Sequence, residues 1–150
     1  MKILPDATPD NPLLKLDKQL CFSVYALSRL ITKAYQPLLE KLDVTYPQYL
    51  VLLLLWEHQA LTVKQLGEKL LLDSGTLTPL LKRMEQRQLL SRLRDSRDER
   101  SVIATLQPAG RALQADAQDI PMQVAERLQM EPAEINSLRI RLCNLINLLT

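Results

Sequence analysis

The stretch TVKQLGEKLLLDSGTLTPLLKRMEQRQLLSRLRDSRDERSVIATL, residues 62–106, carries the signals that decide the fold. Thr62 and Asp73 each stand directly before a run with helical spacing, where a side-chain oxygen can cap the free N–H groups of a first helical turn. After residue 90 the pattern changes to short, mixed polar and apolar segments on both sides of the charged tip SRDER, which is typical of a β-hairpin. This stretch therefore predicts helix, short turn, helix and hairpin.

Helical patterns flank the stretch on both sides. Apolar residues recur at three- and four-residue steps over about residues 14–42, with candidate helix starts at Asn11 and Asp17 and an expected kink or break at Pro37. Three further helices are expected: about residues 47–56, a helix that opens at Pro108 and is interrupted at Pro121, and an amphipathic helix over residues 131–149.

This order of elements indicates a mainly α-helical fold with a small β-hairpin wing, the winged helix-turn-helix, in which the helix after Asp73 would be the recognition helix. Leucines and Met84 form its expected buried face. Small hydroxyl side chains and bases remain on the other faces, where they suit base edges and phosphates respectively. The DNA contacts predicted on this helix are Ser74, Thr76, Thr78, Lys82 and Arg83.

The uneven distribution of charge favours a nucleic-acid partner. Residues 62–111 hold ten Lys or Arg and six Asp or Glu, a net charge of +4, whereas the remainder holds nine and eleven, a net charge of −2. A solvated surface would also explain so modest an excess. Together with the helix order, however, the excess favours double-stranded DNA.

The composition excludes most enzyme templates. One histidine (His58), three glycines and no Cys-x-x-Cys leave no catalytic triad, phosphate-binding loop or zinc ligand set, so we expect no enzyme activity, metal or cofactor. No apolar run approaches the roughly 18 residues of a membrane span, and no signal segment is visible. We therefore expect a cytoplasmic protein without a membrane partner, whose two cysteines are free thiols.

Four segments together match a known pattern. They are QLCFSVY (19–25), VTYPQYLVLLLLWE (44–57), LDSGTLTPLLKR (72–83) and the wing signature Asp-x-Arg-x-x-Arg at Asp95, Arg97 and Arg100. With them the chain resembles, over roughly residues 14–148, the MarR family of bacterial regulators and, within it, the organic hydroperoxide sensors known as OhrR. The resemblance implies a homodimeric repressor that binds palindromic operator DNA and leaves it when an organic hydroperoxide oxidises its N-terminal cysteine.

The resemblance also implies a layout for the chain. Residues 1–13, which hold three prolines, would be a flexible arm, and residues 14–150 a single domain. The DNA-binding winged helix would occupy about residues 47–107. The dimerisation helices, about 14–42 and 108–149, would interleave with those of a second copy.

Site residues follow from the same resemblance. Cys21 would be the redox sensor, Tyr35 and Tyr46 would donate hydrogen bonds to its sulfur across the dimer, and Tyr25 would line the same pocket. On the wing, the resemblance implies that an aspartate orients an arginine in the minor groove. The predicted wing residues are Arg94, Arg97 and Arg100 as DNA contacts, with Asp95 in support.

The spacing of the first helix agrees with this assignment. Cys21, Tyr25, Ser28, Thr32 and Tyr35 fall at alternating steps of four and three, which makes a polar seam beside the leucine stripe. Tyrosines at the boundary of a helix and a core would also give this pattern. Because Cys21 and Tyr35 are fourteen residues apart, roughly 21 Å along a straight helix, they can meet only if two copies of the helix run past each other.

The surroundings of Cys21 favour a reactive thiolate. If the helix starts at Asp17, Cys21 lies in its first turns, where the helix dipole favours an anion, and Lys18 lies about one turn before it. Oxidation to sulfenic acid would then remove the charge that holds the tyrosines. The candidate walls of an apolar pocket that admits apolar peroxides are Phe22, Val24 and Trp56.

The second thiol departs from the pattern of the two-cysteine sensors. Those members carry a resolving cysteine near the end of the helix before the last one, where this chain has VAERLQM, with Glu126 and Met130 at the matching positions. Cys143 lies instead on the final helix, where packing alone would explain it. Three fates of oxidised Cys21 stay open: capping by a low-molecular-weight thiol, a bridge to Cys143, or overoxidation.

Two other functions fit parts of the sequence. One is a MarR-type regulator that responds to a small phenolic or aromatic ligand, with Cys21 incidental. The other is a one-cysteine thiol peroxidase, which would need a Thr/Pro and Arg setting that the neighbours of Cys21 do not supply.

Overall fold

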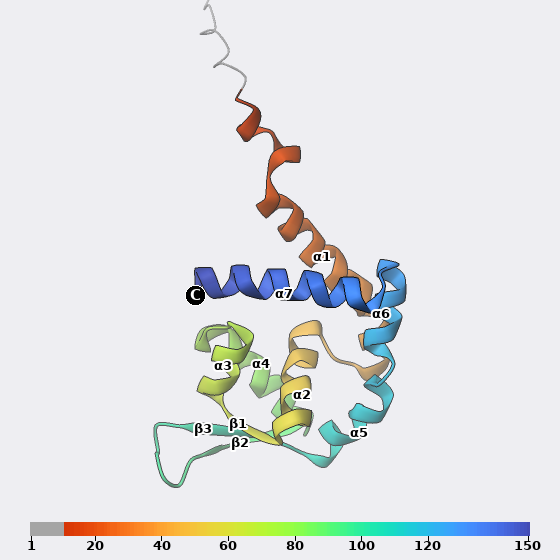
Figure 1. Cartoon of the computed structure of the whole chain (residues 1–150). Helices are drawn as coiled ribbons and strands as arrows, with labels where there is room; N and C mark the ends of the chain where they lie inside the picture. The colour runs from red at the N-terminus through yellow and green to blue at the C-terminus, as the bar shows by residue number, and fades with distance from the viewer. Residues whose placement is uncertain (1–10) are drawn as a thin grey trace, which may run out of the picture. The chain divides into compact units, whose positions relative to one another are not determined.

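The computed structural model describes residues 11–150 (Figure 1), so residues 1–10, which hold most of the predicted flexible arm, lie outside the described part. The chain forms two compact units, Met1–Lys33 and Ala34–Thr150, and helix α1 belongs in part to each. The helices are α1 Leu20–Leu39, α2 Tyr46–His58, α3 Val63–Leu70, α4 Ser74–Gln86, α5 Pro108–Ala117, α6 Ile120–Leu128 and α7 Pro132–Leu149. The strands are β1 Ala60–Thr62, β2 Leu90–Arg94 and β3 Val102–Leu106, and the 3-10 helices are η1 Pro12–Leu14, η2 Leu16–Lys18 and η3 Glu40–Leu42.

Helix α1 begins later than either predicted start. Asn11 accepts a backbone hydrogen bond at 3.0 Å, but the helix that it caps is the short η1. Asp17 lies inside η2, and the extended backbone of Gln19 (φ −90°, ψ 109°) separates η2 from α1, which starts at Leu20. Both predicted starts are therefore wrong, because each cap signal serves a single 3-10 turn.

Pro37 does not break α1, so of the predicted kink or break the break is wrong. The helix continues to Leu39, and η3 follows directly. A proline removes one backbone hydrogen bond of a helix, and here only two helical residues follow it, so the cost falls on the last turn. Pro79 likewise lies inside α4 without ending it.

Side-chain caps start the helices of the winged region where the sequence predicted them. The N–H of Gln65 donates to the Thr62 hydroxyl at 3.1 Å, and the N–H of Thr62 donates to the Gln65 side chain at 2.9 Å, which is a reciprocal capping box for α3. Thr45 and Gln48 form the same arrangement at α2. Asp73 caps α4, and the predicted caps at Thr62 and Asp73 are confirmed.

The three strands form one antiparallel sheet in the order β1-β3-β2. Strands β2 and β3 form the predicted hairpin, in which Arg92 lies opposite Ala104. The structure adds β1, which pairs with the other side of β3 so that Leu61 also lies opposite Ala104. The sequence did not reveal β1, because it has only three residues and its last one, Thr62, is also the cap of α3.

The hydrophobic core of the second unit is built from α2, α3, α4 and the sheet. Its fully buried side chains are mainly leucines, and Met84 joins them from α4. Helix α5 packs directly on backbone: a Cβ added to Gly110 would lie 2.2 Å from the carbonyl oxygen of Leu89, so only glycine fits at this contact. The recognition helix and the wing are therefore held by packing within one chain.

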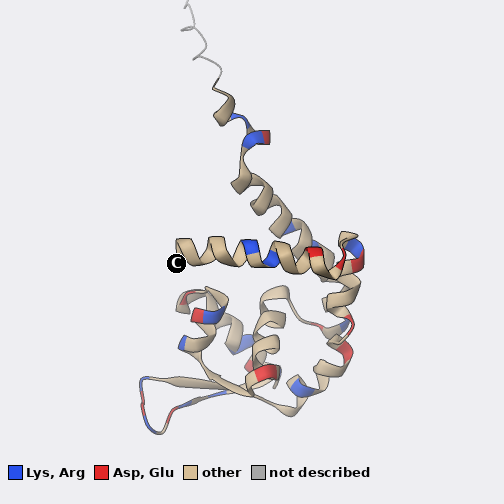
Figure 2. Cartoon of the chain, in the orientation of Figure 1, with Lys and Arg blue, Asp and Glu red and all other residues tan. Residues whose placement is uncertain are grey.

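Helices α1 and α7 bury few of their own apolar side chains. In α7 no residue is buried, and in α1 only Leu38 and Leu39 are. Figure 2 shows that the C-terminal half of α7 carries little charge. Among residues 11–150, no helix is both long and apolar enough to span a membrane. The exposed large apolar side chains include Leu20, Phe22, Val24, Leu27 and Leu30 of α1 and Leu138, Ile140, Leu145, Ile146, Leu148 and Leu149 of α7.

Candidate functional site

Helix α4 presents its predicted polar residues to solvent. Of the expected buried face, Leu77, Leu81 and Met84 are completely buried, whereas Leu80 is only partly buried at its edge. Asp73 accepts the N–H of Thr76 at 2.8 Å, and this backbone hydrogen bond holds the pKa of the Asp73 carboxyl below its usual range. The residues predicted to contact DNA, all exposed, are Ser74, Thr76, Thr78, Lys82 and Arg83.

The wing tip is shaped by aspartates that bind backbone. The Asp95 carboxylate accepts the N–H of Arg97 at 2.9 Å, and the Asp98 carboxylate accepts the N–H of Arg100 at 3.1 Å. Asp95 thus holds the main chain of the tip at Arg97. The short Asp side chain reaches the N–H two residues on, as in an Asx-turn.

The three wing arginines are exposed but differ in their contacts. Arg94 donates from Nη1 to the carbonyl oxygen of Glu99 at 3.4 Å, so its guanidinium crosses the tip. Among residues 11–150, the guanidinium groups of Arg97 and Arg100 have no hydrogen-bond or ion-pair partner. Figure 2 shows Lys or Arg and Asp or Glu mixed along this loop. Arg97 and Arg100 are the wing cations with the most freedom to meet phosphate.

Two ion pairs fix the C-terminal end of α4. Glu85 accepts hydrogen bonds from both Nε (3.1 Å) and Nη2 (2.9 Å) of Arg92, and also from the N–H of Arg92 at 2.8 Å. These bonds, the side-chain ones first, hold the pKa of Glu85 below its usual value. Arg87 pairs with Asp43 at 3.2 Å, which ties the same end to the turn before α2. Sequence reasoning missed both pairs, because each joins residues from two elements that meet only in the folded chain.

A cleft of about 720 Å³ lies between α3, α4 and the base of the wing. Ser74 and Thr78 line it from α4, and Arg92 and Arg100 line it from the hairpin side. The structure thus brings together three residues predicted separately as DNA contacts, from the recognition helix and from the wing. Hydroxyl groups and a guanidinium on one concave surface can bind phosphate and base edges.

Cys21 is an exposed free thiol at the second position of α1. Tyr25, one turn later, is also exposed, and the Arg29 guanidinium lies 5.5 Å from its ring centroid. Lys18 pairs with Asp17 at 3.5 Å. The position in the first helical turn agrees with the expectation, since the free N–H groups there favour an anion.

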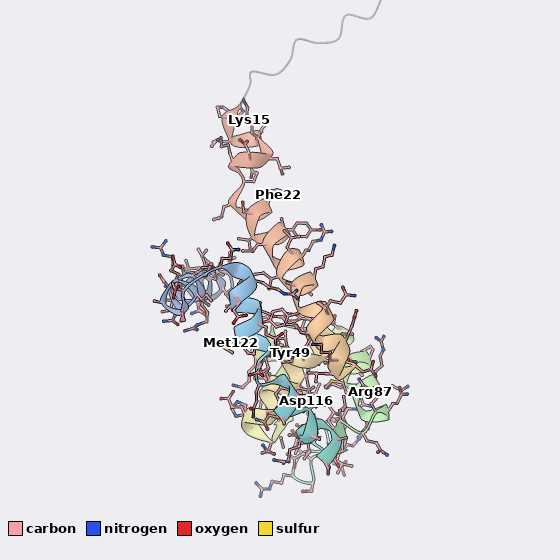
Figure 3. All side chains as sticks on the ribbon, turned by 90° about the vertical axis from the view of Figure 1, so that its right-hand side faces the viewer. Lys15, Phe22, Tyr49, Arg87, Asp116 and Met122 are labelled. Atoms are coloured by element: carbon pink, nitrogen blue, oxygen red, sulfur yellow. The ribbon has the colours of Figure 1, made fainter. Side chains whose placement is uncertain are left out.

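Tyr35 and Tyr46 lie in contact in the second unit, with ring centroids 4.9 Å apart. Tyr49, which the sequence did not single out, packs against both, at 5.8 Å from Tyr35 and 6.3 Å from Tyr46. It is 2% exposed and lies among the helices of this unit (Figure 3). The signal that could have found it is the three-residue spacing from Tyr46, which puts both rings on one face of α2.

Burial makes these three hydroxyl groups harder to ionise than a free tyrosine. Desolvation raises the pKa of Tyr49 to about 12, with smaller contributions from Tyr35 and Tyr46. Burial raises the pKa of Tyr35 and of Tyr46 in the same direction. No hydrogen bond within residues 11–150 uses any of the three hydroxyls, so each is a neutral donor available to another partner.

Trp56 and Cys143 are both partly buried. The Trp56 ring packs edge-on against Tyr49 at 6.2 Å, and its Nε1–H donates to the carbonyl oxygen of Gly110 at 2.9 Å. Cys143 is a free, partly buried thiol of α7. Within the described ranges, no three His, Cys, Asp or Glu side chains gather as a metal site would need.

Comparison with known proteins gives consistent matches. The MarR family pattern matches residues 44–102. The organic hydroperoxide resistance transcriptional regulator of Bacillus subtilis (strain 168) is 52% identical over 136 residues, which cover 91% of this chain and 92% of that protein. Reduced AbfR bound to DNA is a structural match with a TM-score of 0.76 at 38% identity, over 89% of this chain and 92% of that one. Overoxidised AbfR bound to DNA has a TM-score of 0.73 at 37% identity, over 90% and 95%.

These matches test the predictions of fold, of enzyme activity and of family. The mainly helical fold with a small antiparallel sheet is that of winged-helix DNA-binding regulators, as the element order predicted. The matched proteins are transcriptional regulators and not enzymes, which agrees with the expectation from composition. On a relative of 52% identity over nearly its whole length, this chain belongs to the MarR family.

Proposed function

We propose that the protein is a homodimeric repressor that binds a palindromic operator while Cys21 is reduced and releases it when an organic hydroperoxide oxidises Cys21. The observation that carries this proposal is that one chain holds both an exposed thiol in the first turn of α1 and a cluster of tyrosines whose hydroxyl groups make no hydrogen bond within residues 11–150. The named relatives support it, since one is an organic hydroperoxide resistance transcriptional regulator and the other is found on DNA in reduced and overoxidised forms.

Operator binding would use α4 and the wing. The α4 residues Ser74, Thr78 and Lys82 follow at steps of four on one exposed side, which suits insertion of a helix into the major groove. Arg97 and Arg100 at the wing tip would reach the neighbouring phosphates or minor groove. Two such surfaces related by a dimer axis would require half-sites about 10 bp apart.

The dimer would bury the apolar side chains that α1 and α7 leave exposed. Leu145 and Ile146 are 44% and 43% exposed within the chain, on a helix with no buried residue. A contiguous apolar surface of this kind on a small protein marks an interaction site. A second copy also suits the geometry of the sensor, because Cys21 and Tyr35 are fourteen positions apart in the sequence, which in a straight α-helix would be roughly 21 Å.

In the reduced dimer, Tyr35 and Tyr46 of one subunit would donate hydrogen bonds to the Cys21 thiolate of the other, with Tyr25 at the edge of the pocket. Burial raises the pKa of both tyrosines, which favours the protonated hydroxyl that donates a hydrogen bond. A hydrogen bond to a charged group contributes about 1.5–3 kcal/mol, which is enough to shift a two-state equilibrium about tenfold or more.

Oxidation would remove that charge. The thiolate attacks one oxygen of the hydroperoxide, the S–O bond forms, the O–O bond breaks, and the alkoxide leaves as an alcohol after taking a proton from solvent. Sulfur is oxidised to the sulfenic acid and the peroxide is reduced. A low-molecular-weight thiol could then condense with the sulfenic acid to form a mixed disulfide with release of water, and reduction of that disulfide would restore the thiol.

The direct test is an electrophoretic mobility shift on the DNA upstream of the protein's own gene, with and without cumene hydroperoxide. Wild-type protein should bind when reduced and release when oxidised, whereas Cys21→Ser should bind and ignore the peroxide. Release from Cys21→Ser by a phenolic ligand but never by peroxide would favour the ligand-responsive alternative. Steady consumption of peroxide with a thiol reductant, without any DNA binding, would favour the thiol peroxidase.

A second measurement tests the dimer on DNA. Inserting five base pairs between the half-sites rotates one half-site to the opposite side of the duplex, so binding should fall to the non-specific level. Inserting ten base pairs brings both half-sites back to the same side of the duplex and serves as the matched control. Equal affinity for the unmodified and the five-pair operators would contradict two linked recognition helices.

A further inference from the structure

We infer that Tyr49 and Trp56 form the mechanical link that carries a displacement of the sensor tyrosines to the junction between the recognition helix and the wing. The inference rests on the proposed function, because it names the path by which oxidation of Cys21 would reach DNA. Every residue of the link lies in the second unit, Ala34–Thr150.

The near end of the link is the tyrosine cluster. Tyr49 is the one ring that touches Tyr35, Tyr46 and Trp56, with centroid separations between 5.8 and 6.3 Å. It is almost completely buried, and Figure 3 shows it among helices from both ends of the unit. In a close-packed interior a ring with such neighbours cannot stay in place when two of them move.

The far end of the link is a hydrogen bond to backbone. The Trp56 Nε1–H donates to the carbonyl oxygen of Gly110 at 2.9 Å. Gly110 in turn lies against the carbonyl group of Leu89, so closely that even a Cβ would be 2.2 Å from its oxygen. A shift of Trp56 is therefore passed to the backbone at Leu89 and not absorbed by a flexible side chain.

Leu89 is the residue at which α4 gives way to the wing. Its N–H donates to the carbonyl oxygen of Met84 in α4 at 3.0 Å, and its carbonyl oxygen accepts the N–H of Gln107, just after β3, at 3.0 Å. Leu90 then begins β2. A displacement here changes the angle between recognition helix and wing, the two elements whose joint placement on DNA sets affinity.

Tyr49 is thus a positioning residue that acts through its ring. Since its hydroxyl makes no hydrogen bond within residues 11–150, Tyr49→Phe should keep the link, whereas Tyr49→Leu should lose it. Trp56→Phe removes the N–H to Gly110 together with one ring of the indole, and leaves a smaller aromatic ring against Tyr49. Val51→Ala, a core truncation two positions along α2 and therefore on another face, is the matched control for lost packing.

The experiment measures two quantities for each variant: the rate of Cys21 oxidation by cumene hydroperoxide, and the ratio of operator Kd values between fully oxidised and reduced protein. For Trp56→Phe we expect a wild-type oxidation rate and a ratio reduced about threefold, the size of one ordinary hydrogen bond. For Tyr49→Leu we expect slower oxidation and a reduced ratio, while Tyr49→Phe and Val51→Ala should keep the wild-type ratio.

The following results would contradict the proposed link through Tyr49 and Trp56. A wild-type ratio in Trp56→Phe means that the hydrogen bond to Gly110 carries nothing, and slowed oxidation with an intact ratio means that Trp56 belongs to the peroxide pocket. An equal loss in Val51→Ala means that any core damage has this effect. Failure of the proposed function is distinguishable, because wild-type protein itself would then show the same Kd with and without peroxide.

Discussion

Helices α4 and α7 differ in how far their own chain covers their apolar side chains. Helix α4 buries Leu77, Leu81 and Met84 completely, and two ion pairs hold its C-terminal end. Helix α7 is longer and rich in leucine and isoleucine, yet no residue of it is buried. The comparison teaches that the chain alone covers the apolar face of α4, whereas it leaves the apolar side chains of α7 uncovered, as the proposed dimer would require.

A charged substitution on α7 should reduce operator affinity most, because it would disrupt the proposed dimer surface. Leu145→Glu places a carboxylate on the apolar stripe, so the dimer should dissociate and operator affinity should fall by more than about a hundredfold. Asn147→Glu, two positions on and on the opposite side of the helix, is the control of equal charge. Light scattering gives the oligomeric state, and circular dichroism should still report a folded winged region. A Leu145→Glu protein that is still dimeric and binds the operator with full affinity would contradict the proposal that α7 is covered by a second copy.

On the DNA-reading side, Arg97→Ala should weaken operator binding without changing the fold. The guanidinium of Arg97 is exposed and its backbone N–H already binds Asp95, so the wing keeps its shape when the side chain is cut. Loss of one phosphate contact per subunit should lower the slope of log affinity against log salt by about one for each contact. The measurement is a titration at several salt concentrations, and an unchanged slope with full affinity would mean that the wing does not touch DNA.

The ion pair between α4 and β2 should contribute a smaller amount to stability. Glu85→Gln loses the charge of a partly exposed pair and should lower the free energy of unfolding by about 1 kcal/mol at neutral pH. Because the pKa of Glu85 is lowered in the folded protein, its stabilisation is present above the unfolded pKa and is lost as pH falls through the folded pKa. The gap between wild type and Glu85→Gln in urea unfolding should therefore close in acid.

Glu68→Gln is the control for that measurement. The Glu68 carboxylate lies 3.9 Å from Lys64 on an exposed helix surface, so its removal should change stability by no more than about 0.5 kcal/mol. Equal effects of the two substitutions would show that the bidentate geometry at Arg92 adds nothing.

The smallest expected effect is at Cys143. This thiol lies on the last helix and not where two-cysteine sensors carry their resolving cysteine, so Cys143→Ser should still release DNA on treatment with peroxide. Mass spectrometry of oxidised wild-type protein should find Cys21 carrying oxygen or a small thiol more often than joined to Cys143. A dominant Cys21–Cys143 disulfide would instead make Cys143 the resolving thiol.

The sequence predicted those parts of the fold that depend on interactions between residues close together in the chain. Thr62 and Asp73 cap helices through hydrogen bonds that span three residues, and the charged tip around Asp95 turns by the same short-range bonding. Strand β1 escaped prediction because its three residues pair with a strand about forty positions later. The start of α1 was wrong because a cap signal does not tell a 3-10 turn from an α-helix.

In the candidate site, too, the residues placed by local spacing were predicted, and the contacts between distant residues were not. The exposed residues of α4 and the wing follow from helical spacing and from a recognisable signature, while the contact of Tyr49 with Tyr35 joins two helices and exists only in the folded chain. The bond between Glu85 and Arg92 likewise needs the register of β2 against the end of α4. The residues next to Glu85 and Arg92 in the sequence give no signal that predicts this bond.

The most direct test of the account uses two heterodimers of identical composition. In the first, one chain carries Cys21→Ser and the other carries Tyr35→Phe; in the second, both substitutions are on one chain and the other is wild type. If thiol and tyrosine meet across subunits, the single Cys21 faces an intact Tyr35 in the first heterodimer and should oxidise at the wild-type rate. In the second it faces phenylalanine and should oxidise about tenfold more slowly, the equivalent of one lost hydrogen bond. The opposite order of rates would contradict the cross-subunit sensor.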